Sequence, residues 1–394
     1  MRKIKRVLAT VCAMTCMTMV APTQAQMTAV KAETTQTSQS TTTNMTVPVT
    51  DEIGNINKYS KGDVMLTPAE HEKTVSLSVT ENMALQVYVY AYAPVSGGAV
   101  EPCTAVLKKA DGTVMASQSV AAKEDTTIEF SKCSTIVADT FVEPGNYTLH
   151  LSNAALQKNV KLLVYVAGYR APLEEELIMG QVTSGYIPSG KTVYKKITMD
   201  QSGIVMVQAM MKDRNTNTQK GATMVLCDDN KDDLTASYTT QETDKYAQIY
   251  ALKQGVYYIK LIGDNSYYAI GGEKQNCKLA KAKKSKALKV TKKKTAIMPV
   301  DFDGDTAWFR FTVNKPKKIK ANLTFWGTGS VQVTVYQGNK KINQCKAIGN
   351  QKCYSFWMRN KKTKNTINWK KGTYYVKVQR VSDETNGKLQ IKLD

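Results

Sequence analysis

The sequence has few of the residues, and none of the short motifs, from which common enzyme sites are built. It contains two histidines in 394 residues and no Cys-x-x-Cys pair. The patterns His-Glu-x-x-His, Ser-x-x-Lys and Gly-x-Ser-x-Gly, which mark several classes of hydrolase, are absent as well. We therefore expect a chain that is not an enzyme, carries no cofactor and has no metal site of the cysteine–histidine kind.

Long apolar runs are also scarce, because the only one spans residues 7–20 at the N-terminus. A basic stretch precedes it and small residues up to Ala25 follow it, which is the three-part pattern of a secretory signal. The run is shorter than the roughly 18–20 residues that a membrane span needs. We expect residues 1–25 to be a signal peptide. The mature chain, without a transmembrane segment, would be secreted, extracellular or loosely associated with the cell surface.

Large apolar side chains are almost missing from the segment that follows. Residues 26–53 are rich in Thr, Ser, Gln and Ala. Such a segment cannot bury enough apolar surface to offset the entropy lost on ordering it. We therefore expect a disordered Ser/Thr-rich linker over residues 26–53.

A repeat organises the rest of the chain. Residues 143–151, 253–261 and 370–378 each contain a turn glycine followed by an alternation of apolar and polar side chains. The glycines stand at positions 145, 255 and 372. A two-residue period is typical of a strand with one buried face, and a repeat of this length indicates one domain per repeat.

Hairpin signals between these landmarks, and the lack of a helical period, favour an all-β fold. We predict three tandem antiparallel β-sandwich (jelly-roll-like) domains after the signal peptide and the disordered linker. The predicted limits are 54–168 for domain 1, 170–272 for domain 2, 273–284 for a Lys-rich linker and 285–394 for domain 3.

The third repeat carries the features of a known module in their usual order. An acidic turn at residues 301–305 precedes the strand Trp308-Phe-Arg-Phe311, and a central hairpin precedes the closing strand at 372–378. In this respect it resembles a bacterial pre-peptidase C-terminal domain, although Ala307 stands where that family usually has an acid. The resemblance is good over 285–394, loose over 170–272, and limited to the closing strand in domain 1. It implies β-sandwich modules of exported proteins, some of which bind extracellular matrix or polysaccharide.

Six cysteines remain once Cys12 and Cys16 leave with the signal peptide, and each repeat holds two. One disulfide per domain is the economical pairing in an oxidising compartment, and buried free thiols are the alternative. The predicted pairs are Cys103 with Cys133, Cys227 with Cys277, and Cys345 with Cys353.

Two motifs suggest ligands that their context does not support. Residues 185–192 match the phosphate-loop pattern, but the following residues form a strand pattern instead of the helix that phosphate binding needs, so we expect a surface turn. Asp301, Asp303 and Asp305 resemble the start of a calcium loop, but Thr312 occupies the place of the closing acid. A solvated turn is the default there, with weak calcium binding as the alternative.

Positive charge is concentrated in the last third of the chain. From Lys278 to Asp394 there are 28 basic and six acidic residues, whereas the rest has 26 basic and 27 acidic residues. Most of these cations are lysines, which act as point charges, so the pattern favours diffuse contact with a polyanion over a fitted phosphate site. A lysine-rich surface that serves only solubility is the alternative. The predicted contacts are Lys281, Lys283, Lys284, Lys286, Lys292, Lys293 and Lys294.

All four tryptophans lie in the same third. Trp369 precedes the repeat glycine at a position where the other repeats are apolar, so we expect it in the core. Trp326 and Trp357 align with polar residues and are candidates for sugar stacking, although single surface aromatics are common.

Two hypotheses on function follow from these patterns. In the first, the chain is a secreted non-catalytic binding or adhesion protein. Its basic C-terminal domain would contact anionic cell-wall or other extracellular polymers, such as polysaccharide, or a matrix protein. In the second, it is an accessory or targeting partner of a separate secreted hydrolase, a protease or a glycosidase, as the resemblance implies.

Overall fold

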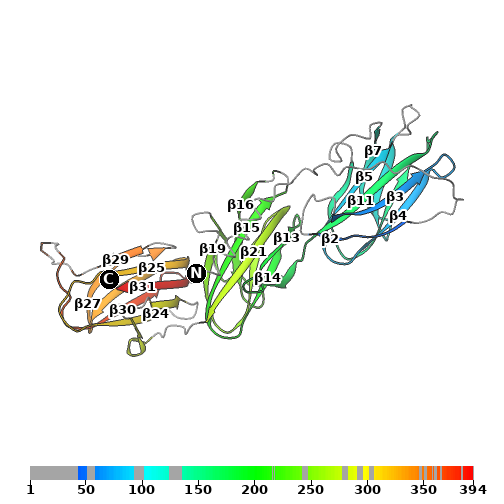
Figure 1. The fold of residues 1–394 in the computed structure, drawn as a ribbon. Coiled ribbons are helices and arrows are strands. Elements are labelled where there is room, and N and C mark those ends of the chain that lie inside the picture. Colours follow the sequence, from blue (N-terminus) through cyan, green and yellow to red (C-terminus); the bar gives the residue numbers. More distant parts are fainter. Residues whose placement is uncertain are drawn as a thin grey trace. The chain divides into compact units, whose positions relative to one another are not determined.

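The structure is a computed structural model of the chain. It describes residues 43–50, 58–92, 102–123, 135–214, 216, 218–241, 247–276, 283–290, 296–300, 306–345, 348–349, 353–356, 358, 362–363, 366–382 and 385–393. These residues form strands almost throughout, which confirms the predicted all-β class. The described strands form six sheets that we group in three pairs, named sandwich 1, sandwich 2 and sandwich 3 (Figure 1). The predicted signal peptide lies outside the described residues.

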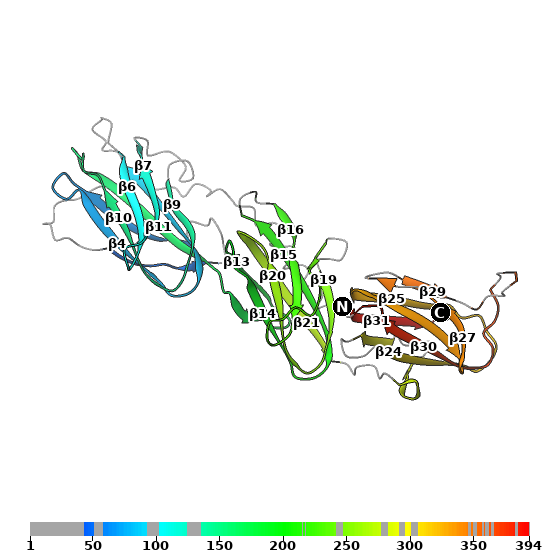
Figure 2. The ribbon, with the colours of Figure 1, turned by 180° about the vertical axis from the view of Figure 1, so that it is seen from behind.

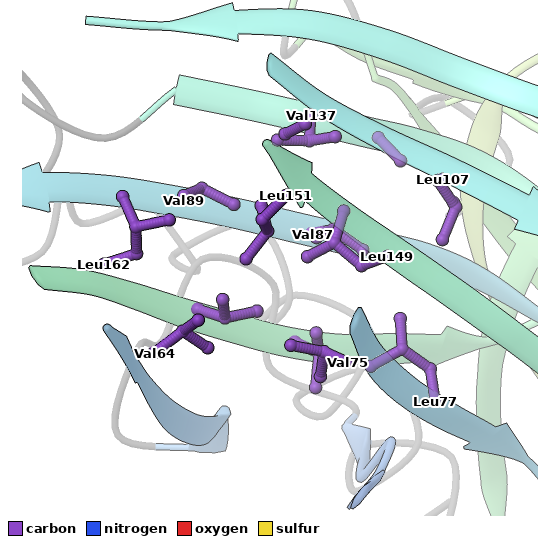
Figure 3. Packing of buried hydrophobic residues seen from close by; sticks show 14 of the residues in the cluster. Val64, Val75, Leu77, Val87, Val89, Leu107, Val137, Leu149, Leu151 and Leu162 are labelled. Carbon is purple, nitrogen blue, oxygen red and sulfur yellow. The ribbon is translucent and has the colours of Figure 1, made fainter. Parts of the chain in front are cut away.

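Sandwich 1 consists of two sheets packed face to face. Its strands are β1 (Thr43–Thr46), β2 (Val49–Thr50), β3 (Ser60–Leu66), β4 (Glu72–Val79), β5 (Met83–Tyr92), β6 (Cys103–Lys109), β7 (Val114–Val120), β8 (Ala122–Lys123), β9 (Thr135–Val142), β10 (Gly145–Ser152) and β11 (Val160–Arg170). The order is β1-β4-β10-β6-β7 in one sheet and β2-β11-β5-β8 in the other, where β3 joins β11 and β9 joins β5. Alternate side chains such as Leu77, Leu149, Val87 and Leu162 meet in the core between the sheets (Figure 3).

Sandwich 2 repeats this plan with fewer strands. They are β12 (Glu174–Glu176), β13 (Val182–Ile187), β14 (Val193–Met199), β15 (Gly203–Asp213), β16 (Gln219–Gly221), β17 (Thr223–Cys227), β18 (Tyr238–Thr239), β19 (Ala247–Leu252), β20 (Gly255–Ile262) and β21 (Ser266–Asn276). The two sheets have the orders β12-β14-β20-β17-β18 and β13-β21-β15-β16, and β19 pairs with β15.

Sandwich 3 begins with the 3-10 turn η4 (Lys284–Lys286). Its strands are β22 (Leu288–Lys289), β23 (Ala296–Val300), β24 (Thr306–Val313), β25 (Ala321–Thr328), β26 (Ser330–Gln337), β27 (Lys340–Gln344), β28 (Ile348–Gly349), β29 (Cys353–Phe356), β30 (Gly372–Arg380) and β31 (Asn386–Leu393). The sheets run β22-β24-β30-β26-β27, with β28 beside β26, and β23-β31-β25-β29 (Figure 2). Phe309, Phe325 and Val376 are among the side chains that fill the core between them.

The first sheet of each sandwich shares one strand order. A short first strand pairs in parallel with a longer one, which pairs with the closing strand that begins at the repeat glycine. Gly255 and Gly372 both have φ of +151°, a conformation that side chains with a Cβ rarely adopt. This backbone geometry explains why glycine recurs at the start of β20 and β30.

The predicted linker ends earlier than residue 53. Thr43–Thr46 pairs with β4, and Met45 and Val47 are buried in the core of sandwich 1. Val49–Thr50 adds to the second sheet as β2. The prediction was wrong here because it averaged composition over the whole segment, whereas a few apolar side chains at alternate positions are enough to dock a short strand.

The described residues fall into two compact units. One contains the residues up to Leu173 together with Ser184–Lys191, and the other contains Glu174–Thr183 and the residues from Thr192 onward. Sandwich 1 therefore belongs to the first unit, and sandwich 3 shares the second unit with most of sandwich 2. The predicted limits of the three domains and of the Lys-rich linker remain predictions.

Within the second unit, one asparagine joins sandwich 3 to sandwich 2. The Asn386 side chain is fully buried and bonds the backbone of Ala251 twice. Its Oδ1 accepts from the Ala251 N–H at 2.7 Å, and its Nδ2 donates to the Ala251 carbonyl at 2.8 Å. A carboxamide matches the hydrogen-bond pattern of a peptide group, so Asn386 satisfies backbone groups of β19 as a neighbouring strand would.

The core of sandwich 2 contains a charged pair. Lys195 lies on the inward face of β14 with its side chain 0% exposed, and its Nζ contacts the carboxylate of Glu175 on the adjacent strand β12. Nζ also donates to the Tyr268 hydroxyl at 2.6 Å. Phe309 occupies the equivalent place in sandwich 3. Lys195 pairs with the residue four positions after Gly255, and Phe309 pairs with the residue four positions after Gly372.

Candidate functional site

Three of the seven predicted polyanion contacts are described by the structure. Lys283, which precedes the 3-10 turn η4, and Lys286, its last residue, are both exposed. Lys284 is half-buried, and its Nζ donates to the Gly338 carbonyl at 2.6 Å and to Asn339 Oδ1 at 2.8 Å. Lys284 is therefore anchored to sandwich 3. The other four predicted contacts, Lys281, Lys292, Lys293 and Lys294, lie outside the described residues.

Eight exposed lysines gather at one end of sandwich 3, and we call this surface the lysine end. The connection between β24 and β25 contributes four of them, the residues before β30 two, and the start of β27 two. Backbone pairing brings these segments together, since Lys317 pairs with Trp369, and Gln337 pairs with Tyr374 near the start of β30. The lysine end consists of Lys315, Lys317, Lys318, Lys320, Lys340, Lys341, Lys370 and Lys371.

Trp369 holds the lysine end in place. Its side chain is 1% exposed, as predicted for a core residue, and its indole N–H donates to the Ile319 carbonyl at 2.8 Å. The ring packs edge-on against Tyr374 and Phe311, with centroid distances of 4.6 Å and 5.4 Å. The Tyr374 hydroxyl in turn donates to the Lys370 carbonyl at 3.0 Å. The lysine-bearing loops are thus fastened to a rigid aromatic core.

The described part of sandwich 3 has no acidic residue to neutralise these lysines. From Lys283 onward, every Asp and Glu of the sequence falls outside the described residues. Ion pairs on the described surface of sandwich 2, such as Lys274 with Asp200 at 2.6 Å, have no counterpart among the described residues of sandwich 3. Among the described residues of sandwich 3, therefore, no acid compensates the charge of the lysine end.

A second feature of sandwich 3 is an aromatic cluster on the outward face of its first sheet. Trp308, Tyr336 and Tyr375 come from the neighbouring strands β24, β26 and β30, and all three are half-buried. The ammonium group of Lys284 lies over their rings, 6.0 Å, 5.8 Å and 4.7 Å from the respective centroids. These distances suit attraction between a cation and the faces of aromatic rings.

Sandwich 2 has a related cluster at equivalent strand positions. Lys231 lies over Tyr194 and Tyr258, 4.9 Å and 5.3 Å from the ring centroids. Here the ammonium also pairs with the Glu174 carboxylate at 2.7 Å. The hydrogen bond from Lys231 lowers the pKa of Glu174, and the same bond raises the pKa of Lys231. The cation in sandwich 2 is therefore neutralised within the chain.

The two tryptophans predicted for sugar stacking have different outcomes. Trp326 is half-buried on the outward side of β25, with the Lys388 ammonium 5.4 Å from its ring centroid. Trp357 lies outside the described residues. The sugar-stacking prediction remains untested for both.

The predicted disulfides are not tested, because the side chain of one member of each pair lies outside the described residues. Among the described residues, Cys103, Cys227 and Cys345 are buried free thiols, and no two cysteines lie at disulfide distance. The predicted partners Cys133 and Cys277, and the side chain of Cys353, lie outside the described residues. The three pairings stay predictions.

Cys227 is expected to resist alkylation in the native protein. Burial, together with the hydrogen bond to Asp233 at 3.3 Å, raises the pKa of its thiol to about 12. At pH 8 only on the order of one thiol in 10⁴ would then be the reactive thiolate. Iodoacetamide should label the Cys227 peptide after denaturation if the thiol is free, and only after denaturation plus reduction if it is paired with Cys277. Equal labelling rates in the native and denatured chain would contradict this prediction.

The remaining sequence motifs supply no ligand site in the described chain. Residues 185–187 are the buried end of β13, and only residues 188–192 form the turn into the strand β14, with no helix after it. The acidic turn with Asp301, Asp303 and Asp305 lies outside the described residues. Elsewhere in the described ranges, no group of three or more His, Cys, Asp or Glu could hold a metal ion. No helix among the described residues is long and apolar enough to cross a membrane.

Sequence reasoning did not find the lysine end or the aromatic cluster. The lysines at 315–320, 340–341 and 370–371 are visible in the sequence, but only the pairing of Lys317 with Trp369 and of β26 with β30 brings them together. The signal for the aromatic cluster was the alternation along β24 and β30, which places Trp308 and Tyr375 on the outward face of two strands that pair with each other.

Comparisons with known proteins give distant similarities only. No family model and no curated protein matches the chain. One similar solved structure is the pre-peptidase C-terminal domain of collagenase from Bacillus anthracis, at 16% identity and a TM-score of 0.23, covering 30% of this chain and 100% of that one. Another is the CUB1-EGF-CUB2 domain of human MASP-1/3, at 9% identity and a TM-score of 0.16, covering 54% and 99%. A third is the M60 catalytic domain with the CBM51-1 and CBM51-2 domains of Clostridium perfringens ZmpB, at 8% identity and a TM-score of 0.19, covering 83% and 33%. The chain is thus similar to these β-rich structures, and none of them assigns it a ligand.

Proposed function

We propose that this chain is a secreted, non-catalytic binding protein whose third sandwich contacts anionic polymers of the cell wall or the extracellular matrix. The observation that carries the proposal is the lysine end. It places eight exposed lysines on one surface, and the described residues of sandwich 3 contain no acid that would neutralise them.

Eight like charges on one surface repel one another, and a polyanion relieves this repulsion while releasing its own counterions. The lysines are exposed, so salt screens them over a length of about 8 Å at 0.15 M. Only polymer that lies directly on the surface would then be held. Lysine ammonium groups have no fixed fork geometry, so the contact would select for charge density more than for shape.

The proposal predicts a strong and local salt dependence. In the full chain, Lys317, Lys318, Lys370 and Lys371 are replaced together by Gln. Retention on purified anionic wall polymer or on a soluble polyanion should weaken, and the slope of log affinity against log salt should fall by about one unit for each lysine that makes a contact.

The matched control removes four exposed lysines from the first unit, namely Lys58, Lys61, Lys109 and Lys191. Both variants lose the same net charge, so a purely global effect would weaken retention equally in both. An equal loss in the two variants, or parental salt dependence in the lysine-end variant, would show that the lysine end is only a solvated surface.

A further inference from the structure

We propose that the aromatic cluster of sandwich 3 is a binding site for a carboxylate-bearing sugar ring, such as a uronic-acid unit of an acidic polysaccharide. The site consists of Lys284, Trp308, Tyr336 and Tyr375. This inference rests on the proposed function, because it names the class of polymer that the basic third sandwich would hold.

The cluster has a fixed geometry. Trp308 and Tyr336 lie with their ring centroids 5.6 Å apart and their planes tilted by 39°. The Lys284 ammonium is held above the cluster by the Gly338 carbonyl and Asn339 Oδ1. A half-buried ring face beside an anchored cation offers a stacking surface and a charge whose positions do not have to be ordered when a ligand binds.

The comparison with sandwich 2 shows what the site lacks. There, Glu174 pairs with Tyr194 across the parallel strands, and its carboxylate neutralises Lys231. In sandwich 3, Leu288 pairs with Phe309, so Ala287 occupies the place beside Trp308 that Glu174 has beside Tyr194. Among the described residues, no carboxylate lies within ion-pair distance of Lys284.

The carboxylate that the described residues do not supply indicates the class of ligand. A carboxylate would complete in sandwich 3 the contact that Glu174 makes in sandwich 2, and a ring attached to it would lie on the half-buried aromatic faces. Arg310 and Lys377 flank the cluster on β24 and β30, opposite Tyr375 and Trp308. They extend the positive surface along the sheet, which suits successive carboxylates of a polymer. A neutral sugar lacks the charge, and a polyphosphate lacks the ring.

The test compares three polymers on the full chain. Polygalacturonate has sugar rings with carboxylates, dextran has rings without charge, and polyphosphate has charge without rings. Trp308→Ala should weaken polygalacturonate binding about three- to tenfold, which is the range expected for one aromatic contact, and should leave polyphosphate binding unchanged. Lys284→Gln should also weaken polygalacturonate binding. Dextran should bind neither the parent nor the variants measurably.

Tyr194→Ala is the matched control, since it removes the equivalent ring from the neutralised cluster of sandwich 2 and should leave binding of all three polymers unchanged. Thermal unfolding of each variant shows whether it is folded, and Lys284→Gln keeps the test informative if Trp308→Ala does not fold. Parental binding of polygalacturonate by the variants, or an equal loss for polyphosphate, would overturn the site. If the sugar site is overturned but the lysine-end variant still binds polygalacturonate and polyphosphate more weakly than the parent, the proposed function survives without the sugar site. If that variant loses neither, the proposed function fails as well.

Discussion

Replacing Glu175 alone by Leu is expected to destabilise sandwich 2 by about 3–5 kcal/mol, because it leaves a fully buried lysine without its counter-charge. The Lys195 side chain is 0% exposed, whereas that of Glu175 retains 18% exposure. The hydrogen bond from Nζ to the Tyr268 hydroxyl would remain, but a neutral acceptor does not offset the desolvation of an ammonium ion.

The double variant Glu175→Leu with Lys195→Phe is the control for this prediction. It copies the residue types at the equivalent register positions of sandwich 3, where Phe309 is buried and Leu288 is exposed. Buried ion pairs are often replaced by apolar pairs at little or no cost, so the double variant should recover most of the lost stability. Urea unfolding, with hydrogen exchange read on β14 and β20 peptides, measures both effects. A single variant within about 1 kcal/mol of the parent, or a double variant as unstable as the single one, would contradict the role assigned to the pair.

Trp369→Ala is expected to destabilise sandwich 3 by about 3–5 kcal/mol, the usual cost of truncating a large buried aromatic side chain. The substitution removes the ring that packs against Phe311 and Tyr374. It also removes the donor that holds the Ile319 carbonyl, so the connection that bears Lys317, Lys318 and Lys320 would keep its backbone pairing at position 369 but lose its side-chain anchor. Polyanion retention should weaken although no charge is lost.

Trp369→Phe separates the two contributions. It keeps a ring in the core but has no N–H for Ile319, so the Ile319 carbonyl loses the indole donor at a cost of about 1–3 kcal/mol. Ile367→Ala, at a side chain with 38% exposure in the same segment, is the control and should change stability little. Near-UV circular dichroism during guanidinium unfolding follows the aromatic core. If Trp369→Ala unfolds at the parental midpoint, the tryptophan does not organise this end of the sandwich.

The strands and their buried faces were predictable because a two-residue period is a local property of the sequence. Tyr147, Leu149 and Leu151 alternate with polar residues, and in β10 these three are buried. Trp369 was placed correctly in the core for a similar reason, since the equivalent residues in the other repeats are apolar. In contrast, the linker prediction missed Met45 and Val47, because two apolar residues hardly change the mean composition of a segment.

Features that depend on strand pairing were not predictable. Lys195 has the same parity as Ile197 and Met199, which places it on the inward face, but its partner Glu175 lies 20 residues earlier on another strand. Nothing local connects the two. The same holds for Lys284 and Tyr336, which meet only because η4 and β26 belong to one sandwich. The sequence shows which residues are charged or aromatic, and the register decides which of them meet.

The short first strands have a consequence for how this protein can be divided. β1 pairs in parallel with β4 and covers one edge of the first sheet of sandwich 1, while Met45 and Val47 complete the core beneath it. A fragment that starts at the predicted boundary of residue 54 would lack both β1 and β2. It would leave the N–H and C=O groups along β4 open, and open strand edges are templates for pairing between molecules. Such a fragment should aggregate or exchange strands. One that starts before Thr43 keeps β4 paired and leaves only the four-residue β1 as that edge, so it should stay monodisperse in sedimentation.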